Sequence, residues 1–464
     1  MSKELNTDKI RPSFSKPICL SFGNFCLANI PFVQTLPISD ETLHSPNKLG
    51  VNLKLNLKNT PIYYKIFQKE GPFMINRKIS DSIKESTLQV PVVTILGPRQ
   101  SGKTTLVRNL FPDYAYINLE DRVTRNLAEN DYIGFFKKYS EPMIIDEVQR
   151  VPELLSAIQV KVDEDRRKNG RFILTGSYQP KLQEAVSQSL AGRTTIHTLY
   201  PLSLEEINKQ SELDEIIIRG FMPELYGYNA RKPNVYYRDY LNTYIEKDLR
   251  QMISIKNLNA FLRFLTLLAG RVGQIINLSA LAGEVGVSSV TLGEWLSVLE
   301  ASFVIFKLPP YFSNISKRIV KSPKTYFVEP GLAAYLLGIE SVRQASRDPL
   351  RGNLFENIVV LEAMKTRLND NKDPNLYYVR TEKGVEIDLI LKKEGMLFPF
   401  EIKSSMTPNK DFAKNMKVFC QNEPNSGEMA VIYCGERYDS FQNCKYLNYS
   451  TLAEEIRQPP QLTP

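Results

Sequence analysis

Histidine and cysteine, which build most zinc and acid–base centres, are scarce in this chain of 464 residues. Only two histidines are present, His44 and His197, which argues against metal binding or proton transfer by imidazole. The five cysteines are odd in number and lack Cys-x-x-Cys spacing, so the sequence predicts neither a disulfide framework nor a zinc site. A reducing cytoplasm is the expected location.

Long apolar runs and a strong net charge are missing as well. Residues 17–38 carry no charge, but Ser, Asn, Gln, Gly and Pro interrupt this stretch throughout, so no membrane segment is predicted. With 59 basic and 51 acidic residues the formal charge is +8, which permits a polyanionic partner such as DNA without requiring one. The length exceeds what one hydrophobic core supports, and about two to four domains are expected.

The most informative segment lies at residues 92–105, where the apolar run Val-Val-Thr-Ile-Leu leads directly into Gly-x-x-x-x-Gly-Lys-Thr. Glycines at both ends of such a loop let backbone N–H groups and a helix N-terminus face a phosphate. Lys103 is expected to reach the β- and γ-phosphates and the Thr104 hydroxyl to ligate Mg²⁺, while Thr105 begins the helix. The predicted nucleotide-binding residues of this loop are Gly97, Pro98, Arg99, Gln100, Ser101, Gly102, Lys103, Thr104 and Thr105.

Two further apolar runs end in polar residues and predict the rest of this site. The first ends at Asp146 and Glu147; Asp146 would hold Mg²⁺ through its water shell, and Glu147 would polarise the water that attacks the γ-phosphate. The second ends near Thr175 and Ser177, either of which could touch the γ-phosphate or the attacking water. A turn or a helix N-cap is the alternative role for both hydroxyls, and the sequence does not choose between these roles.

On these motifs the chain resembles the AAA-type P-loop ATPases of bacteria and archaea that carry a C-terminal domain of uncharacterised function. The matching stretches are residues 95–105, 145–149, 174–177, 190–193 and 199–203. The resemblance runs from about Met74 to about Gln421. It implies an α/β fold with a parallel sheet, in which the strand of Thr175 lies between the strands of the two phosphate-site motifs. It also implies ATP as the nucleotide and an arginine, Arg193, aimed at the γ-phosphate, although Arg193 could instead complement the dipole at the end of a helix.

Residues 278–299 have the pattern of a helix-turn-helix, in which Gly286 makes the turn and Ser288 caps the second helix. The positions expected to face a core are Leu278, Leu281, Ala282, Val285, Leu292, Trp295, Leu296 and Leu299. Strand-like residues 303–308 and 325–328 would complete a winged helix. The start of the second helix offers no Arg or Lys, which argues against direct reading of DNA bases.

The loop between those two strands is basic. It carries Lys317, Arg318, Lys321 and Lys324, which could contact the phosphates of a nucleic acid. The alternative is a solvated basic loop or a brace on the ATPase. The sequence leaves both interpretations open.

A second group of acids lies near the C-terminus, where a helix at 353–362 and three strands at residues 376–405 are predicted. Strand alternation places Glu386 and Asp388 on one face, and Glu401 and Lys403 together on one face of the next strand. Asp388 and Glu401, with Glu356 from the helix, are predicted to bind Mg²⁺, while Lys403 would orient a water or steady a pentavalent phosphate.

These acids resemble the metal-dependent PD-(D/E)xK nuclease core. Asp388 and Glu401-x-Lys403 match its motif, and Glu356 stands where its helix acid would be, but Ile387 replaces the usual proline before the aspartate. The resemblance implies a small α/β domain with a nuclease site acting on DNA. A salt bridge on an edge strand and a domain that only binds a partner are the alternatives.

The expected organisation has five parts. They are residues 1–73, a disordered tail or an extension upstream of a true start at Met74; 74–205, the AAA-type P-loop core; 206–255, a helical connector or lid; 256–345, a winged helix-turn-helix; and 346–464, the nuclease-like domain. The translation start could be tested by the intact mass of the native protein.

The sequence as a whole predicts an ATP-binding protein with Mg²⁺ as cofactor, whose ATPase cycle is coupled to a nuclease-like domain acting on DNA. The predicted catalytic residues are Lys103, Glu147, Arg193, Asp388, Glu401 and Lys403. Two alternatives stay open: an ATP-dependent switch with an inactive C-terminal binding domain, and a nucleotide-dependent scaffold that does not hydrolyse. The nucleic-acid preference, the oligomeric state, including a homo-oligomer, and the pathway are left open.

Overall fold

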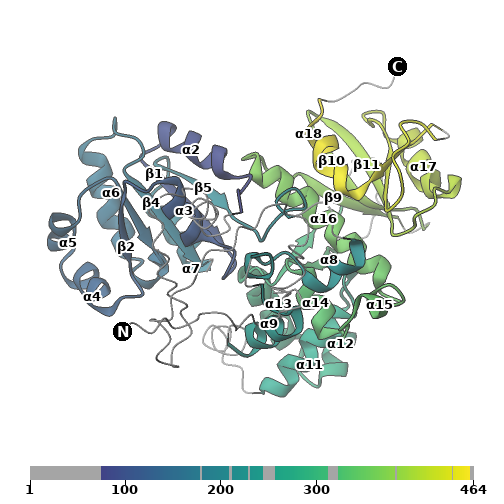
Figure 1. The fold of residues 1–464 in the computed structure, drawn as a ribbon, viewed down its shortest axis with the longest axis horizontal. Helices are drawn as coiled ribbons and strands as arrows, with labels where there is room; N and C mark the ends of the chain where they lie inside the picture. Colours follow the sequence, from purple (N-terminus) through teal and green to yellow (C-terminus); the bar gives the residue numbers. More distant parts are fainter. Residues whose placement is uncertain are drawn as a thin grey trace, which may run out of the picture. The chain divides into compact units, whose positions relative to one another are not determined.

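The computed structural model describes residues 75–177, 180–207, 212–227, 230–243, 257–311, 322–381, 384–441 and 443–459. Within these ranges the chain forms three β-sheets, each with helices packed on it (Figure 1). The predicted extension at residues 1–73 lies outside the described residues, as do Lys317, Arg318 and Lys321 of the predicted basic loop. No helix in the described ranges has the length and the apolar character that a membrane crossing needs.

The first sheet consists of five parallel strands in the order β2-β3-β4-β1-β5. Its strands are β1 (Val92–Gly97), β2 (Ala115–Asn118), β3 (Met143–Asp146), β4 (Phe172–Ser177) and β5 (Thr194–Thr198). Every residue of β1, β3 and β4 is buried, as expected for parallel strands covered on both faces. Because β4 lies between β1 and β3, the strand order implied by the family resemblance is confirmed.

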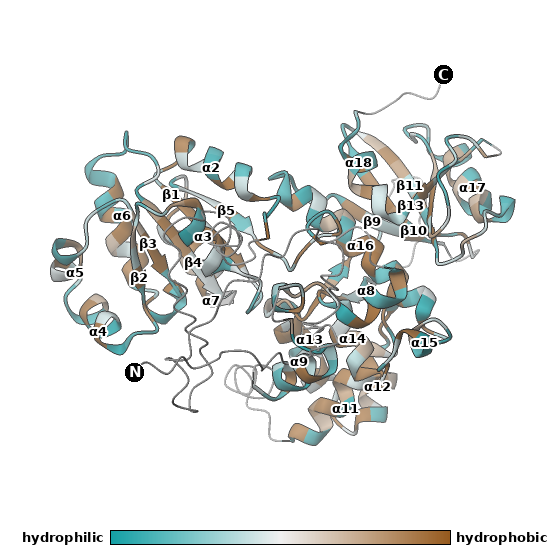
Figure 2. Cartoon of the chain, viewed as in Figure 1, coloured by the Kyte–Doolittle hydropathy of each residue, from teal (hydrophilic) through white to brown (hydrophobic). Residues whose placement is uncertain are grey.

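Helices cover both faces of this sheet. They are α2 (Ser80–Gln89), α3 (Lys103–Leu110), α4 (Arg122–Asn130), α5 (Tyr132–Lys138), α6 (Leu154–Glu164) and α7 (Pro180–Ser189), with the short 3-10 helix η1 (Val148–Arg150) after β3. Helices α2 and α3 pack on the face that carries Val93 and Ile95, while α4 to α7 pack on the face that carries Val92 and Leu96. The central strands are apolar along most of their length, brown in Figure 2. The polar residues of β3 and β4 lie at the carboxyl ends of these strands.

The middle region combines a small antiparallel sheet, in the order β6-β8-β7, with a group of helices. Its elements are α8 (Leu213–Arg219), η2 (Pro223–Leu225), α9 (Pro233–Tyr240), α11 (Leu258–Ala269), β6 (Gln274–Ile275), α12 (Leu278–Val285), α13 (Ser289–Ala301), β7 (Ile305–Leu308), β8 (Lys324–Phe327), α14 (Pro330–Leu336) and α15 (Val342–Ala345).

The predicted helix-turn-helix corresponds to α12 and α13. Gly286 has φ 83°, a left-handed conformation that ends α12, and the Ser288 hydroxyl caps α13 by accepting a backbone N–H at 3.1 Å. Trp295 packs between two phenylalanine rings of α11, with ring centroids 5.1 and 5.7 Å away. The predicted core positions are buried except Leu278, which is 38% exposed. Leu278 is the first residue of α12, before the turn that contacts the core, so its prediction as a core residue was wrong.

The C-terminal sheet has the order β13-β12-β11-β10-β9, with β9 to β11 antiparallel and β11 to β13 parallel. The elements are α16 (Arg351–Asn369), β9 (Leu376–Arg380), β10 (Glu386–Lys393), β11 (Met396–Lys403), η4 (Lys410–Ala413), α17 (Lys414–Asn422), β12 (Ala430–Tyr433), β13 (Lys445–Asn448), η5 (Tyr449–Thr451) and α18 (Leu452–Arg457). Helices α16 and α18 pack on one face and α17 on the other. The predicted helix and three strands are all present.

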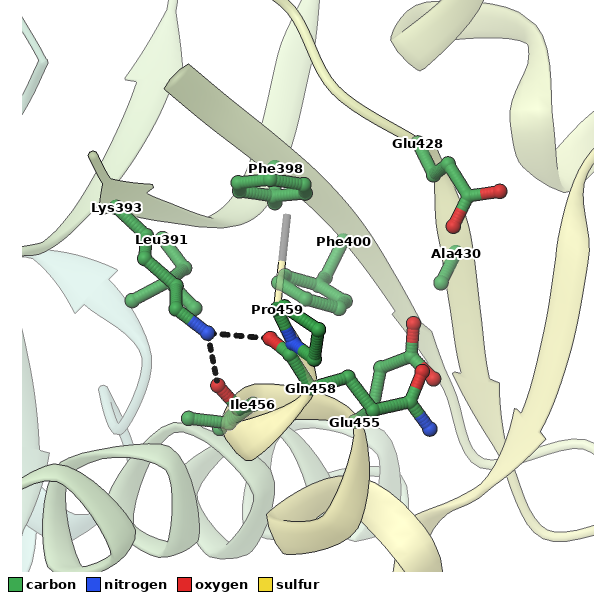
Figure 3. A pocket seen from close by; sticks show the side chains of 10 residues that line it. All are labelled: Leu391, Lys393, Phe398, Phe400, Glu428, Ala430, Glu455, Ile456, Gln458 and Pro459. Atoms are coloured by element: carbon green, nitrogen blue, oxygen red, sulfur yellow. Dashed lines mark hydrogen bonds between the residues drawn. The ribbon is translucent and has the colours of Figure 1, made fainter. Parts of the chain in front are cut away.

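A small cavity of about 30 Å³ lies between this sheet and the end of α18 (Figure 3). Beside it, Lys393 Nζ donates to the carbonyl oxygens of Ile456, at 3.2 Å, and Gln458. These carbonyls lie at the C-terminal end of α18, where a cation satisfies acceptors that the helix leaves unpaired. The cavity has room for roughly two waters at most. We therefore interpret Lys393 as a cap of α18 and not as part of a ligand site.

Candidate functional site

The phosphate loop joins β1 to α3, and its backbone requires glycine at two positions. A Cβ atom on Gly97 would lie 2.2 Å from the carbonyl oxygen of Leu199, so a side chain here would collide with the chain that follows β5. Gly102 has φ 91°, a left-handed conformation, immediately before α3. The helix begins at Lys103, two residues before the predicted start at Thr105. Its free N-terminal amides therefore follow the loop directly, as an anion site needs.

Lys103 is the cation of this loop and is 6% exposed. Its ammonium donates to the carbonyl oxygens of Gly97 at 3.1 Å and Pro98 at 2.7 Å. Burial lowers the pKa of Lys103 to about 8, although the carboxylates of Glu147 and Asp146 act in the opposite direction. A bound triphosphate would add negative charge beside the ammonium and favour its charged form.

Two residues outside the predicted motifs, Arg77 and Tyr236, contact the phosphate loop. Arg77, which precedes α2, donates to the carbonyl oxygen of Ser101 at 2.7 Å and to that of Tyr200 at 2.7 Å. Tyr236 of α9 donates its hydroxyl to the Gln100 side chain at 2.6 Å. The loop therefore contacts both the segment after β5 and the middle region.

Asp146, at the end of β3, brings three predicted residues together and is 3% exposed. Its carboxylate accepts hydrogen bonds from the hydroxyls of Thr104 at 2.9 Å and of Thr175. A third donor is Tyr116 of β2, at 2.7 Å, which the sequence analysis missed because only strand pairing places it beside β3. Ser177 Oγ is buried and has no hydrogen-bond partner among the described residues, so its role stays open. A hydroxyl and a carboxylate side by side are suitable oxygen ligands for Mg²⁺.

Glu147 follows Asp146 in a left-handed conformation, with φ 59°. Non-glycine residues rarely adopt this conformation, and it turns the side chain out of the strand direction. The Glu147 carboxylate accepts a hydrogen bond from the side-chain amide of Gln149 in η1. The carboxylate of the predicted base is thus oriented by a neighbour on its own loop.

A cavity of about 430 Å³ adjoins the loop where α3 begins. Its lining includes Ile75, Asn76, Thr105, Leu106, Asn109 and Pro223. The walls combine apolar side chains with Arg77, Ser80 and two side-chain amides, and the predicted loop residue Thr105 lines this cavity, whereas Thr104 contacts Asp146. Arg99 is half-buried at the tip of the loop.

Arg193 does not reach this site. It directly precedes β5, and its carbonyl oxygen accepts from the N–H of Val92, the first residue of β1, whereas the phosphate loop follows the other end of β1. The guanidinium pairs with Asp163 at 2.8 Å and donates to the carbonyl of Ala191 at 2.9 Å, beyond the end of α7. The prediction that Arg193 faces a phosphate on the same chain was therefore wrong, and the contact favours its alternative role near a helix end.

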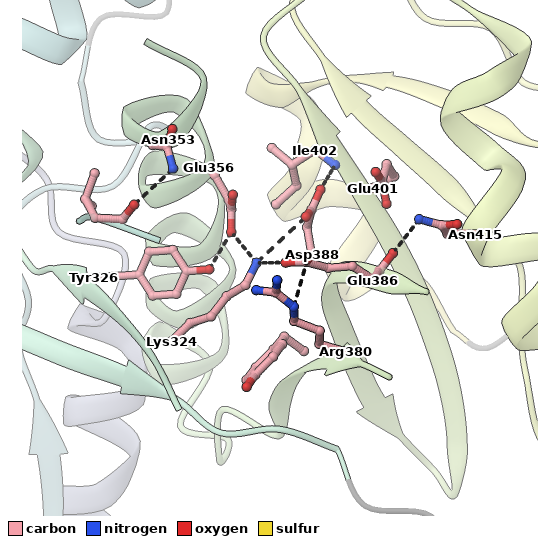
Figure 4. A network of polar contacts seen from close by, with 12 residues as sticks. Lys324, Tyr326, Asn353, Glu356, Arg380, Glu386, Asp388, Glu401, Ile402 and Asn415 are labelled. Carbon is pink, nitrogen blue, oxygen red and sulfur yellow. Dashed lines mark hydrogen bonds and ion pairs between the residues drawn. The ribbon is translucent and has the colours of Figure 1, made fainter. Parts of the chain in front are cut away.

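The predicted acids of the C-terminal site, Glu356, Asp388 and Glu401, lie near one another in Figure 4. Lys403 Nζ lies 2.6 Å from Glu401 and 3.5 Å from Asp388, and Asp388 also accepts the N–H of Ile402 at 2.9 Å. Burial and the neighbouring Asp388 raise the pKa of both Glu356 and Glu401 to about 7. Within the described ranges, however, no three acids, histidines or cysteines are arranged to hold a metal ion. The predicted ligands Glu356, Asp388 and Glu401 are near one another but do not surround one metal position.

A second lysine explains this arrangement. Lys324 was counted among the cations of the basic loop, but it is the first residue of β8, is 3% exposed and points into the acids. Its ammonium lies 3.0 Å from Glu356, 2.9 Å from Glu386 and 3.9 Å from Asp388. Burial lowers the pKa of Lys324, but the carboxylates outweigh this effect and raise it. Of the interpretations left open for the basic loop, contact of Lys324 with nucleic-acid phosphates is therefore not supported, because its ammonium lies among buried carboxylates.

Three family models match separate parts of the chain. An AAA domain matches residues 89–208, and two domains of unknown function, DUF8612 and DUF4143, match residues 210–343 and 351–452. The parallel sheet, the glycine-bounded loop and the Asp146 cluster agree with the first match. Residues 89–208 thus form a P-loop ATPase domain of the AAA type, which supports binding of ATP.

The comparison with whole proteins gives the family. The chain is 31% identical over 364 residues to "Uncharacterized protein Rv2008c" of Mycobacterium tuberculosis, covering 78% of this chain and 80% of the relative. It is 25% identical to "Uncharacterized protein MJ1637" of Methanocaldococcus jannaschii, covering 75% of this chain and 82% of the relative. The chain belongs to the family of Rv2008c.

Among solved structures, the Walker-type ATPase paby2304 of Pyrococcus abyssi is similar at 15% identity, with a TM-score of 0.40. The match covers 57% of this chain and 96% of that structure. At this TM-score it establishes neither the fold nor the function of the present chain.

Proposed function

We propose that this protein is a Mg²⁺-dependent ATPase. The observation that carries the proposal is the Asp146 carboxylate, which joins the loop hydroxyl of Thr104 to Thr175 on the neighbouring strand. Thr104 and Asp146 would hold the metal, which supplies charge neutralisation on the phosphate oxygens. Lys103 would bind the β- and γ-phosphates, and Glu147 would take the proton of the attacking water.

The cavity beside the loop would receive the nucleoside. Its apolar residues, among them Ile75, Leu106 and Pro223, suit the faces of a flat base, and the amide of Asn76 could bond to the base edge. Because Gly102 and Thr105 line the same cavity, a base there would be continuous with phosphates in the loop.

Asp146→Asn is expected to reduce Mg²⁺-dependent phosphate release from ATP by about 10–100-fold, the usual range for residues that orient metal ligands. Release would be measured with ATP and Mg²⁺ and, as a blank, with EDTA. Asp113→Asn, the same change at an exposed turn residue, should leave the rate unchanged. A wild-type protein that binds ATP but releases no phosphate would support the scaffold alternative instead.

Helix α16 offers a route by which the nucleotide state would reach the C-terminal domain. Glu362 accepts the N–H of Leu204 at 2.9 Å, and Lys365 donates to the carbonyl of Leu202 at 2.6 Å. Leu202 and Leu204 follow Tyr200, whose carbonyl shares the Arg77 guanidinium with the phosphate loop. We infer that ATP binding and hydrolysis are coupled to the C-terminal domain along this chain of contacts, whether that domain cleaves DNA or only binds a partner.

Nuclease activity is the second candidate function, favoured by the convergence of Lys403 on Glu401 and Asp388. The elements from α11 to β8 follow the order helix–strand–helix–helix–strand–strand. They would form a winged helix beside the nuclease-like domain. Asp388→Asn is expected to abolish cleavage of DNA in ATP with Mg²⁺ or Mn²⁺, because the carboxylate would hold the metal. Asp439→Asn, at an exposed position, is the matched control. Intact DNA with the wild-type protein would leave the domain as a binding module.

A further inference from the structure

The carboxylates of the C-terminal domain are neutralised from outside that domain. Lys324 belongs to β8 of the middle sheet, yet its ammonium lies among Glu356 of α16 and Glu386 and Asp388 of β10 (Figure 4). The neighbouring Tyr326 of β8 also donates its hydroxyl to Glu356, at 2.6 Å. Two successive inward-facing residues of one strand therefore bind the acids of another module.

The ammonium of Lys324 occupies a position among carboxylates that would also suit a divalent metal ion. Two of its carboxylate contacts lie at 2.9 and 3.0 Å, the distances of charge-assisted hydrogen bonds. Oxygen ligands of Mg²⁺ or Ca²⁺ lie closer, at about 2.0–2.6 Å. The acids thus stand at ammonium spacing, which explains why the cluster is not arranged as a metal site.

A buried acceptor remains unused in the same cluster. Glu401 is 7% exposed, and one of its oxygens bonds to Lys403 while Oε2 has no hydrogen-bond partner among the described residues. A buried carboxylate oxygen without a partner is costly, and a cation beside it would remove that cost. Arg380 adds a third cation, 3.7 Å from Glu386, and still leaves this acceptor unused. The free acceptor therefore indicates that the cluster can take more positive charge than Lys324, Lys403 and Arg380 supply.

We propose that Lys324 is an internal cation that closes the carboxylate site, and that a divalent metal ion binds there in competition with it. The site opens when β8 withdraws the ammonium, so that Glu356, Asp388 and Glu401 can close to metal distances. The proposal uses the acids of the candidate nuclease site but does not depend on ATP hydrolysis or on DNA cleavage. It assigns to β8 the control of metal entry.

The test is calorimetric titration of Mn²⁺ into the full chain without nucleotide. Lys324→Met is expected to bind Mn²⁺ about tenfold or more tightly than the wild type, because three carboxylates lose their buried counter-charge. Adding Asp388→Asn to Lys324→Met should abolish the gain, which separates this site from the Asp146 site. Lys307→Met removes a partly exposed lysine of the adjacent β7, paired with Glu300 at 2.5 Å, and should behave as the wild type.

If Lys324→Met is poorly folded, thermal unfolding with and without Mn²⁺ replaces the titration. Mn²⁺ should then raise the melting temperature of Lys324→Met and restore its fold, because metal replaces the lost ammonium. Equal Mn²⁺ affinity in Lys324→Met and wild type overturns the proposal. So does a Lys324→Met protein that melts at the same temperature, or stays unfolded, in Mn²⁺ and in EDTA, since Lys324 would then be a structural ion pair.

Discussion

Glu147→Gln is expected to slow ATP hydrolysis by about 10²–10⁴-fold while the affinity for ATP stays close to that of the wild type. Glutamine is nearly the same size as glutamate but cannot accept the proton of the attacking water. The proton transfer belongs to the transition state, so its loss acts on the rate and not on ground-state binding. Gln149, which bonds to the Glu147 carboxylate, can bond equally to the side-chain oxygen of glutamine.

The measurement pairs single-turnover phosphate release with equilibrium binding of a fluorescent ATP analogue. Glu153→Gln makes the same change six residues further on, at an exposed position before α6, and should leave both quantities unchanged. If Glu147→Gln hydrolyses ATP at the wild-type rate, Glu147 is not the base and the water must be activated elsewhere.

Lys365→Ala is expected to lower the free energy of unfolding by about 3–5 kcal/mol, because the buried Glu362 carboxylate loses the positive charge that acts on it. Lys365 is 1% exposed, lies 3.6 Å from the centre of the Phe221 ring and donates to the Leu202 carbonyl. Burial lowers its pKa and raises that of Glu362, so neither group is tolerated alone in its charged form. If Glu362 takes up a proton in the variant, its uncompensated charge is removed, and the loss of unfolding free energy is then at the lower end of this range.

Urea unfolding followed by the fluorescence of Trp295, the single tryptophan, would measure this loss. Lys372→Ala, an exposed lysine just beyond α16, is the control. The double variant Lys365→Met with Glu362→Gln should recover much of the lost stability, because it removes both charges together. A Lys365→Ala variant as stable as the control would show that the Lys365 ammonium contributes nothing to the stability of the fold.

The residues predicted to form the nucleotide site, Thr104, Asp146 and Thr175, lie together in the structure because the pattern that locates them is local. The loop glycines and Asp146 stand at strand ends that apolar runs mark, and the order of those strands followed from the family resemblance. The position of Arg193 relative to the next strand was not used in the prediction of its role. It precedes a strand, and in a parallel sheet the residue before a strand lies at the edge opposite the phosphate loop.

In the C-terminal site, the proximity of Asp388, Glu401 and Lys403 could be predicted from the sequence, but the presence of Lys324 could not. Alternation along two strands was enough to bring Asp388, Glu401 and Lys403 together. Lys324 could not be placed in this way, because a lysine beside a cluster of basic residues has the pattern of a solvated loop. Its burial depends on the packing of β8 against another sheet, which no short segment encodes. Tyr116 and Arg77 were missed for the same reason.

Helix α16 is one uninterrupted element of 19 residues. Glu356 near its start touches Lys324, and Lys365 near its end touches the Leu202 carbonyl, about 13 Å further along the axis at the usual rise per residue. We expect a displacement of about one ångström at Leu202 to reach Glu356 along this helix, because a single helix of this length moves as one body. A displacement that small already exceeds the gap between an ammonium contact and a metal bond, so the spacing of the acids can be reset without any domain rotating.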